Sequence, residues 1–109
     1  MRSFTIALGL ASALGVAAPA LPAAAAPKTH RIIMAGMGFG PAPAGIKAGD
    51  TVVWVNKDLF RHTATARDKS FDVDVMPGKE GRTVVKRSGQ FAYFCRFHPG
   101  MTAMLPVGK

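Results

Sequence analysis

Short apolar stretches, interrupted every few residues by glycine or proline, make up the chain after residue 27. In the clearest of them, 51–56, Val53 and Val55 share one face of an extended chain, and Trp54 lies on the other face. Further stretches rich in Val, Ile, Thr and Phe predict strands at 31–34, 62–66, 71–75, 83–86, 90–95 and 104–107, with a short edge segment at 45–48.

This succession of short strands predicts an all-β domain. Nothing in the region has the spacing of a long amphipathic helix, and Gly-Asp and Pro-Gly pairs separate the apolar stretches. Seven or eight strands with regular turns are typical of an antiparallel Greek-key β-sandwich, and we expect about eight strands. We expect Trp54 in the core, Met34, Met37 and Met76 as apolar filler, and 36–43 as a loop.

The first residues have a different pattern, which predicts a secretory signal. Arg2 precedes an apolar run at 4–18, which is followed by two prolines and a run of alanines. We therefore predict a signal peptide at 1–25 and a mature domain at 26–109, located in the periplasm. An uncleaved membrane anchor is the alternative, because the apolar run and the small residues that follow it are together just long enough to span a bilayer. The prolines and alanines argue against it, so we expect no stable membrane insertion after cleavage.

The mature domain is strongly basic. The sequence has 14 Lys and Arg against 6 Asp and Glu, and only Arg2 lies in the predicted signal. Such a balance suits nucleic acid, an anionic membrane surface or an acidic protein partner. Export argues against nucleic acid as a partner. Because the basic residues are scattered singly, apart from Lys86-Arg87, a merely solvated basic surface is the alternative.

A single cysteine, Cys95, needs its own explanation in an exported protein. It cannot form an internal disulfide, so a free thiol, an intermolecular bridge or a metal ligand remain. It opens the segment Cys95-Arg-Phe-His98-Pro-Gly-Met101, in which one short loop presents a thiolate, an imidazole and a thioether. Upstream, His62 opens a predicted strand. In a sandwich, strand ends that are distant in sequence meet at one pole, so His62 completes the set.

This set of donors selects its metal. Two His and one Cys in a plane, with a long axial Met, form the electron-transfer copper site. Zinc prefers a fourth Cys, His or carboxylate, and iron–sulfur clusters need more cysteines. We therefore predict one copper ion bound by His62, Cys95, His98 and Met101. Met104 is the rival for the axial position, but we expect it to pack against the sandwich. His30, near the mature N-terminus, is expected to be solvated.

Residues 31–107 resemble the cupredoxins, and most closely the group of amicyanin, plastocyanin and pseudoazurin. The short spacing from His98 to Met101 is similar to that of amicyanin, whereas the axial Met lies further on in plastocyanin. The matching segments are Phe39-Gly-Pro41, Gly49-Asp-Thr-Val-Val-Trp-Val-Asn56, His62-Thr63, Pro77-Gly78, Gly89 and Cys95-Arg-Phe-His98-Pro-Gly-Met101.

The resemblance implies an eight-stranded sandwich with one type 1 copper ion. It implies that His98 faces solvent and passes electrons, and that Asn56 and Thr63 lie around the ligands. Thr63 stands where many relatives have an Asn whose side chain ties the two ligand loops together. Relatives often carry Tyr at the position of Phe91.

The predicted function is the shuttling of single electrons between redox partners through Cu(I) and Cu(II). We expect no enzymatic activity, because the sequence offers one metal constellation and little room for a substrate pocket. The alternative is a copper carrier that delivers or sequesters copper in the periplasm. The resemblance suggests an amine dehydrogenase or a c-type cytochrome as the partner. The predicted docking face consists of Met37, Phe39, Phe97 and Pro99.

Two arginines stand beside ligands in the sequence, Arg61 next to His62 and Arg96 next to Cys95. Our hypothesis is that their charge steers a partner with an acidic docking face and raises the copper potential by disfavouring Cu(II).

Overall fold

The computed structural model describes residues 25–109 and, from the preceding segment, only Ser3, Thr5, Gly9, Ala11, Gly15 and Pro19. Most of the predicted signal peptide 1–25 therefore lies outside the described residues. Among the described residues, no helix is long and apolar enough to cross a membrane.

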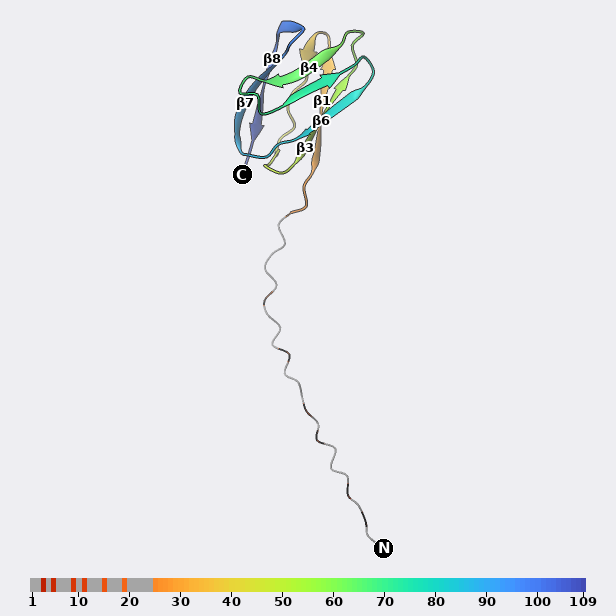
Figure 1. The fold of residues 1–109 in the computed structure, drawn as a ribbon, viewed down its shortest axis with the longest axis vertical. Helices are drawn as coiled ribbons and strands as arrows, with labels where there is room; N and C mark the ends of the chain where they lie inside the picture. Colours follow the sequence, from red (N-terminus) through yellow and green to blue (C-terminus); the bar gives the residue numbers. More distant parts are fainter. Residues whose placement is uncertain are drawn as a thin grey trace.

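The described residues form eight strands, in two four-stranded sheets that pack face to face (Figure 1). The strand order is β2-β1-β3-β6 in one sheet and β5-β4-β7-β8 in the other. This confirms the predicted all-β sandwich of eight strands. The bounds are β1 (Thr29–Ala35), β2 (Gly38–Phe39), β3 (Thr51–Asn56), β4 (His62–Ala66), β5 (Asp72–Val75), β6 (Glu80–Val84), β7 (Gly89–Cys95) and β8 (His98–Val107).

One pairing departs from the antiparallel arrangement that the sequence predicted. Strands β1 and β3 are parallel, with Thr29 opposite Thr51 and Met34 opposite Asn56. The other strand pairs are antiparallel. Parallel neighbours need a connection that returns along the sheet, and residues 40–50 provide it.

Several strand limits also differ from the prediction. Strand β6 covers 80–84 instead of 83–86, and β8 begins at His98 instead of 104. Segment 45–48 forms one isolated bridge, between Lys47 and Gly108, and no strand. Strand β2 lies in the predicted loop. These segments contain Gly, Pro or charged residues, so their pairing depends on neighbouring strands and not on local sequence.

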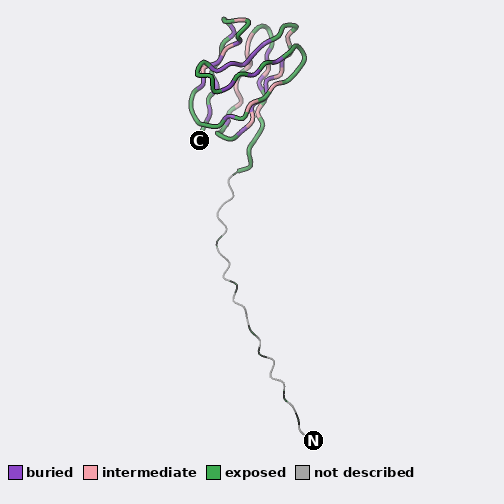
Figure 2. Tube along the Cα trace, in the orientation of Figure 1, coloured by how far each residue is buried: buried purple, intermediate pink, exposed green. Residues whose placement is uncertain are grey.

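The core lies between the two sheets, where buried residues follow the inner faces of the strands (Figure 2). Trp54, Phe71 and Tyr93 form an aromatic cluster with ring centroids 5.4–5.7 Å apart. Trp54 and Met34 are fully buried, as predicted, because every second side chain of a strand points inward. Met37 and Met76 are not core filler, since they lie in the β1–β2 and β5–β6 turns and are 40% and 53% exposed.

The strands run between two ends of the sandwich. Figure 1 shows the β7–β8 turn at one end, while β1 starts and β8 finishes at the other. We call the first the His98 end; it includes the turns at 36–37, 57–61, 76–79 and 96–97. We call the second the Asp50 end; it includes residues 25–30, 45–50, 67–71, 85–88 and 108–109.

Asp50 fastens the start of β1 at its end of the sandwich. Its Oδ1 accepts a hydrogen bond from the Lys28 amide (3.0 Å), and its Oδ2 accepts one from the Lys47 amide (3.0 Å). The same Oδ2 lies 2.8 Å from His30 Nε2. His30 is thus held in a largely buried pair with Asp50. The prediction that His30 is solvated was wrong, because β1 starts early enough to include this residue.

This cluster predicts a specific dependence of stability on pH. Chiefly the Lys28 amide, then the His30 side chain, lower the pKa of Asp50 from 3.8 to about 2. A lowered folded-state pKa contributes stability above the unfolded pKa, and that stability is lost as the pH falls from about 4 to about 2. We expect Asp50→Asn to be less stable than wild type near neutral pH, with the difference vanishing near pH ~2. Urea unfolding of both proteins across this pH range tests the prediction. A difference in unfolding free energy between wild type and Asp50→Asn that stays constant down to pH ~2 would contradict it.

Candidate metal centre

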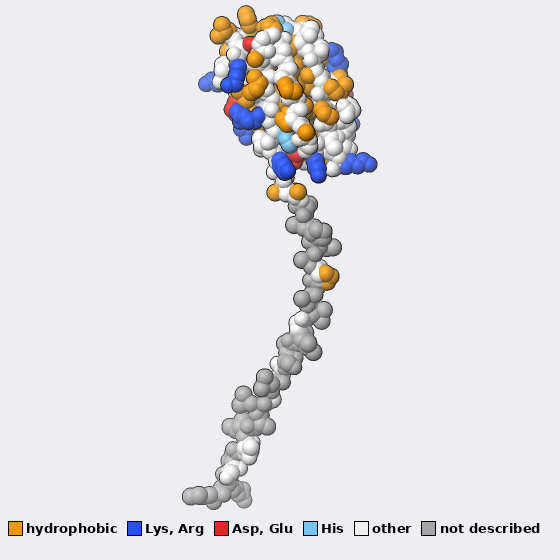
Figure 3. All heavy atoms as spheres, turned by 180° about the vertical axis from the view of Figure 1, so that it is seen from behind, with side chains coloured by type: hydrophobic (Ala, Val, Ile, Leu, Met, Phe, Trp, Pro, Cys, Tyr) orange, Lys and Arg blue, Asp and Glu red, His pale blue; other side chains and the backbone are white. Residues whose placement is uncertain are grey.

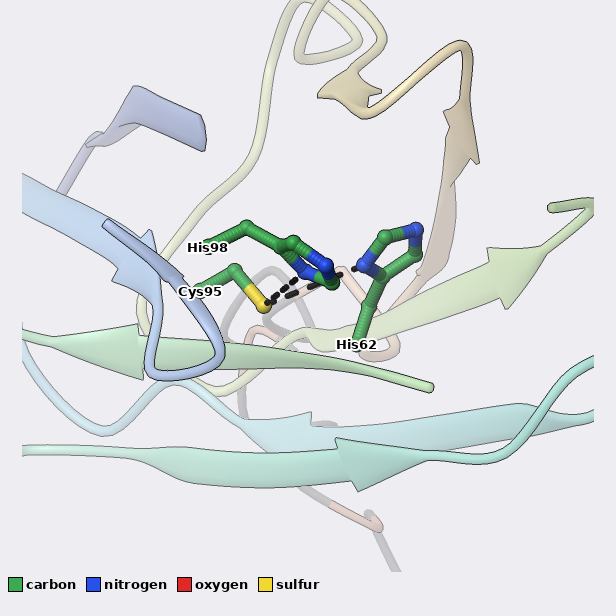
Figure 4. A group of neighbouring side chains, drawn as sticks. All are labelled: His62, Cys95 and His98. Carbon is green, nitrogen blue, oxygen red and sulfur yellow. Dashed lines mark hydrogen bonds between the residues drawn. The ribbon is translucent and has the colours of Figure 1, made fainter. Parts of the chain in front are cut away.

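Three potential metal donors converge at the His98 end (Figure 4). Cys95 Sγ lies 3.8 Å from His62 Nδ1 and 3.6 Å from His98 Nδ1. The three donor atoms are all within 4.8 Å of one another. Cys95 and His62 are fully buried, whereas His98 is partly exposed.

The spacing of these atoms suits a metal ion bound in a trigonal plane. Bonds of about 2.0–2.3 Å from one metal to N and S donors place neighbouring donors about 3.5–4.0 Å apart. The two Sγ–Nδ1 distances of 3.8 and 3.6 Å fall in that interval. One thiolate and two imidazoles match the planar set that copper takes in electron-transfer sites. The residues present therefore fit a copper ion.

A shift in strand register creates this arrangement. Phe94 of β7 pairs with Thr102 of β8, but the next residue, Cys95, pairs with His98. The three residues 99–101 are extra on β8 and form a bulge. A two-residue turn therefore brings His98 opposite Cys95. His62 begins β4, the other neighbour of β7 in the same sheet.

The two candidate axial methionines have opposite surroundings. Met101 ends the bulge and is buried, with 3% of its surface exposed. Met104 lies three residues further along β8 and is 50% exposed. Because side chains alternate along a strand, Met104 points away from the face that buries Met101 and Leu105. Contrary to the prediction, Met104 does not pack against the sandwich.

Asp58 orients the His62 ring, a role that sequence reasoning missed. Its Oδ2 lies 2.8 Å from His62 Nε2, which leaves Nδ1 directed towards Cys95. The pKa of Asp58 is lowered, chiefly because the Met37 amide donates to it and then because His62 does. An ionised carboxylate that holds the outer nitrogen fixes the ring and makes the inner nitrogen a better ligand. The available signal in the sequence was the position of Asp58, four residues before the candidate ligand His62.

Asp58 also anchors the turn between β1 and β2. The Gly36 and Met37 amides donate to its two oxygens, at 2.8 and 3.0 Å. Both turn residues have a positive φ of 59°, a backbone conformation that residues other than glycine rarely adopt. One carboxylate therefore holds a strained exposed turn and a candidate ligand together.

Thr63 connects the segments that carry the candidate ligands His62 and Cys95. Its amide donates to Cys95 Sγ (3.3 Å), and its hydroxyl accepts from the Arg96 amide (2.9 Å). Thr63 is fully buried. Its short side chain suffices because β4 runs directly beside the end of β7.

The Thr63 hydroxyl belongs to a closed ring of hydrogen bonds. It lies 2.9 Å from the Thr65 hydroxyl, which donates to Asp72 Oδ1 at 2.7 Å. Arg96 Nε donates to the same oxygen at 3.1 Å. Since Thr65 uses its hydrogen on Asp72, it must accept from Thr63. The ring thus runs in one direction, from the Arg96 amide through two hydroxyls to Asp72.

Asn56 holds the loop that carries Asp58. Its Nδ2 donates to the carbonyls of Phe60 (2.7 Å) and Val75 (3.0 Å), and its Oδ1 accepts from the Asp58 amide (2.9 Å). Asn56 is fully buried at the end of β3. The hydrogen bonds of Asn56 reach the loop 57–61 and β5, and its connection to the candidate ligands runs through Asp58.

The surface around His98 differs in part from the predicted docking face. Met37 and Phe97 are 40% and 44% exposed, and Pro99 is also exposed. Phe39 instead packs on Tyr93, with centroids 4.6 Å apart, because it lies in β2. The prediction also missed two exposed residues of the loop 57–61, Leu59 (90% exposed) and Phe60 (58% exposed). The Phe60 ring lies 6.2 Å from the His98 ring.

Neither Arg61 nor Arg96 presents an unpaired charge. Arg61 forms an ion pair with Asp74, and Arg96 forms one with Asp72. Both guanidinium groups also stack on Phe97, at 4.8 and 5.5 Å from the ring centroid. Their partners lie on β5, which the sequence alone did not place beside these loops. The paired carboxylates offset the field on which the steering hypothesis relied.

Comparisons with known proteins agree with this geometry. A family model described as "Cupredoxin-like domain" matches residues 5–107. An amicyanin structure from Paracoccus versutus (Thiobacillus versutus) is 24% identical, with a TM-score of 0.61, over 71% of this chain and 78% of that chain. An oxidised methionine-to-leucine mutant of amicyanin is 19% identical, with a TM-score of 0.62, over 71% of this chain and 79% of that one.

Proposed function

Because this chain belongs to the cupredoxin-like family, we propose that it shuttles single electrons between redox proteins in the periplasm. Its cofactor is one type 1 copper ion. The observation that carries the proposal is the convergence of Cys95 Sγ with the Nδ1 atoms of His62 and His98. The proposal includes cleavage of a signal peptide at 1–25 and a mature copper-binding domain at 26–109.

We assign His62, Cys95, His98 and Met101 as the copper ligands. When bound, copper supplies one-electron exchange between Cu(I) and Cu(II), and no substrate bond is made or broken. Asp58 and Thr63 hold the candidate ligands in place through hydrogen bonds within the protein itself. Such preorganisation supports an electron carrier, because a site that rearranges little exchanges electrons readily.

His98 is the proposed path for the electron, because it is the partly exposed member of the set. Apolar side chains around it suit the small contact of a transient redox encounter. The proposed partner is an amine dehydrogenase or a c-type cytochrome. Since Arg61 and Arg96 are paired, we expect apolar contact to contribute more to docking than an acidic face on the partner.

Copper loading followed by two measurements tests the proposal. The copper(II)-loaded protein should show an intense blue thiolate-to-copper band. It should also exchange electrons rapidly with a soluble c-type cytochrome while it retains its copper. The alternative function, copper delivery or sequestration, predicts transfer of copper to a copper-free acceptor protein instead. A colourless protein that binds one zinc ion would overturn both functions.

A matched pair of methionine variants tests the axial ligand. Met101→Leu removes the thioether from the buried position, so we expect a higher reduction potential and an altered visible spectrum, because an apolar axial site disfavours Cu(II). Met104→Leu removes the same group from an exposed position, and its potential and spectrum should match wild type. Voltammetry and optical spectra measure both. Equal effects of the two substitutions would contradict the assignment of Met101.

The role of Asp58 predicts a change in potential. Asp58→Asn keeps a hydrogen-bond acceptor near His62 Nε2 but removes a negative charge that favours Cu(II). We expect the reduction potential to rise by tens of millivolts, where about 59 mV is tenfold in a one-electron equilibrium. Asp68→Asn removes the same charge at the Asp50 end and is the control. A similar shift in both variants would mean that overall charge, and not the contact with His62, is responsible.

A further inference from the structure

The ion pairs of this domain leave its excess positive charge on particular residues. Every acidic residue of the sequence contacts a cationic partner or a histidine, and the pairs are Asp50–His30, Asp58–His62, Asp68–Arg87, Asp72–Arg96, Asp74–Arg61 and Glu80–Arg31. None of these pairs, which cover the described residues, includes a lysine. The excess charge therefore lies largely on the lysines.

The lysines are distributed unevenly between the two ends. Lys28, Lys47 and Lys109 line one hollow at the Asp50 end. Lys86 is close by in the chain, since its neighbour Val85 is hydrogen-bonded to Asp50 and Gly49 through the backbone. All four lysines are exposed. We call these four residues the basic cap.

Asp50 lies beneath the basic cap, but its oxygens point inward. Both oxygens are occupied by backbone amides and by His30, and the side chain is 8% exposed. The lysine head groups around it therefore remain available to an external anion. Figure 3 shows Lys and Arg side chains at this lower end of the domain and along its flanks, whereas hydrophobic side chains lie at the upper end and over the middle of the face.

The composition of the basic cap fits a lipid surface better than a protein. Protein interfaces are depleted of lysine and enriched in aromatic residues, methionine and arginine. The large exposed hydrophobic side chains near the basic cap are limited, among the described residues, to Val84. Flexible ammonium groups without an apolar centre suit a diffuse layer of anionic lipid headgroups, which attracts each nearby lysine.

Chain continuity points to the same surface. Residues 25–27 line the hollow together with Lys28, so the apolar N-terminal sequence joins the domain at the basic cap. Before signal cleavage, the membrane-directed segment and the basic cap therefore share one end, and the candidate metal centre lies at the other. A mature domain held through the basic cap would keep that orientation and present His98 away from the membrane.

We propose that the basic cap binds anionic lipid headgroups and orients the domain with its His98 end outward. This inference goes beyond electron transfer and does not depend on copper. Binding should weaken with salt, because exposed charges are screened over roughly 10 Å at 0.1 M ionic strength. Each lysine near an anionic surface should change the partition coefficient about fivefold.

Vesicle sedimentation tests the proposal with the full chain. The probes are vesicles of phosphatidylcholine alone and of phosphatidylcholine mixed with phosphatidylglycerol. The neutral vesicles measure any binding by the apolar N-terminal sequence, so the proposal concerns only the additional binding to anionic vesicles. We expect Lys47→Gln/Lys109→Gln to reduce this additional binding about 25-fold. Lys57→Gln/Lys79→Gln removes the same charge at the His98 end and should reduce it less than about threefold.

Three results would overturn the proposal. Equal losses in the two double variants would show that net charge alone attracts the protein. Equal binding to neutral and anionic vesicles would assign binding to the apolar sequence. The absence of binding to anionic vesicles would leave an acidic protein as the occupant of the basic cap. Each result leaves the blue band and electron exchange of the copper-loaded protein as separate tests of the proposed function.

Discussion

Replacing Cys95 by serine should abolish the intense visible absorption of the copper(II)-loaded protein. The band requires electron transfer from a thiolate to copper, and Cys95 is the only cysteine in the sequence. Its Sγ is also the atom that lies near both Nδ1 atoms of the candidate ligands. A serine oxygen is a poorer ligand for Cu(I), so we expect weak copper binding and no reversible blue centre.

The fold should survive this substitution. Serine is nearly isosteric with cysteine, and its hydroxyl can still accept the hydrogen bond from the Thr63 amide. The copper-free Cys95→Ser variant should therefore unfold close to copper-free wild type, within about 1–2 kcal/mol. Titration with copper(II), followed by absorption, measures the main effect. A variant that keeps the full band would show that the thiolate is not the source of the colour.

Replacing Asn56 by alanine should cause a large loss of stability. The side chain satisfies two carbonyls and one amide at a fully buried position. Leaving such groups without partners costs about 1–3 kcal/mol each when they are buried. Because the bonds to Phe60 and Asp58 are only partly buried, we expect a total loss at the lower limit for three groups, about 3 kcal/mol. A small domain has only about 5–15 kcal/mol of stability, so this loss is a large fraction of it.

The loss of stability caused by Asn56→Ala should be similar when copper is bound. A ligand that binds only the folded state stabilises wild type and variant alike, because the substitution does not remove a candidate copper ligand. Chemical unfolding of the copper-free and copper-loaded forms measures both values. Gln90→Ala is the control, because it truncates an exposed amide side chain on β7. Equal losses at positions 56 and 90 would contradict the role of the buried hydrogen bonds.

The sequence predicted strands best where local pattern and burial agree. Segments 51–56 and 62–66 match β3 and β4 completely, because their β-branched and small residues suit a sandwich interior. The predicted position of β6 was wrong. Its sequence does not alternate between apolar and polar residues, and it lies at the edge of its sheet, where it pairs only with β3. The parallel pairing of β1 and β3 depends on the route of residues 40–50 and has no local signal.

The candidate site shows the same division. Cys95, His98 and Met101 lie within one short segment, so their spacing alone suggested a common site. His62 required only the expectation that strand ends meet. The contacts of Asp58 and Asp72 were not foreseen, because they depend on the conformation of a loop and on the register of β5 beside β4. The pairing of both arginines was missed for the same reason.

The ring that joins Arg96, Thr63, Thr65 and Asp72 has a consequence for the electric field at Cys95. A row of hydroxyls that ended in water could reverse all its hydrogens together, and each reversal would change that field. In this protein an amide donor at one end and a carboxylate acceptor at the other permit only one orientation. The two hydroxyl dipoles should therefore keep their direction in both oxidation states. The reorganisation energy of electron transfer would then come mainly from the solvent and the partner, with only a small contribution from these hydroxyl groups.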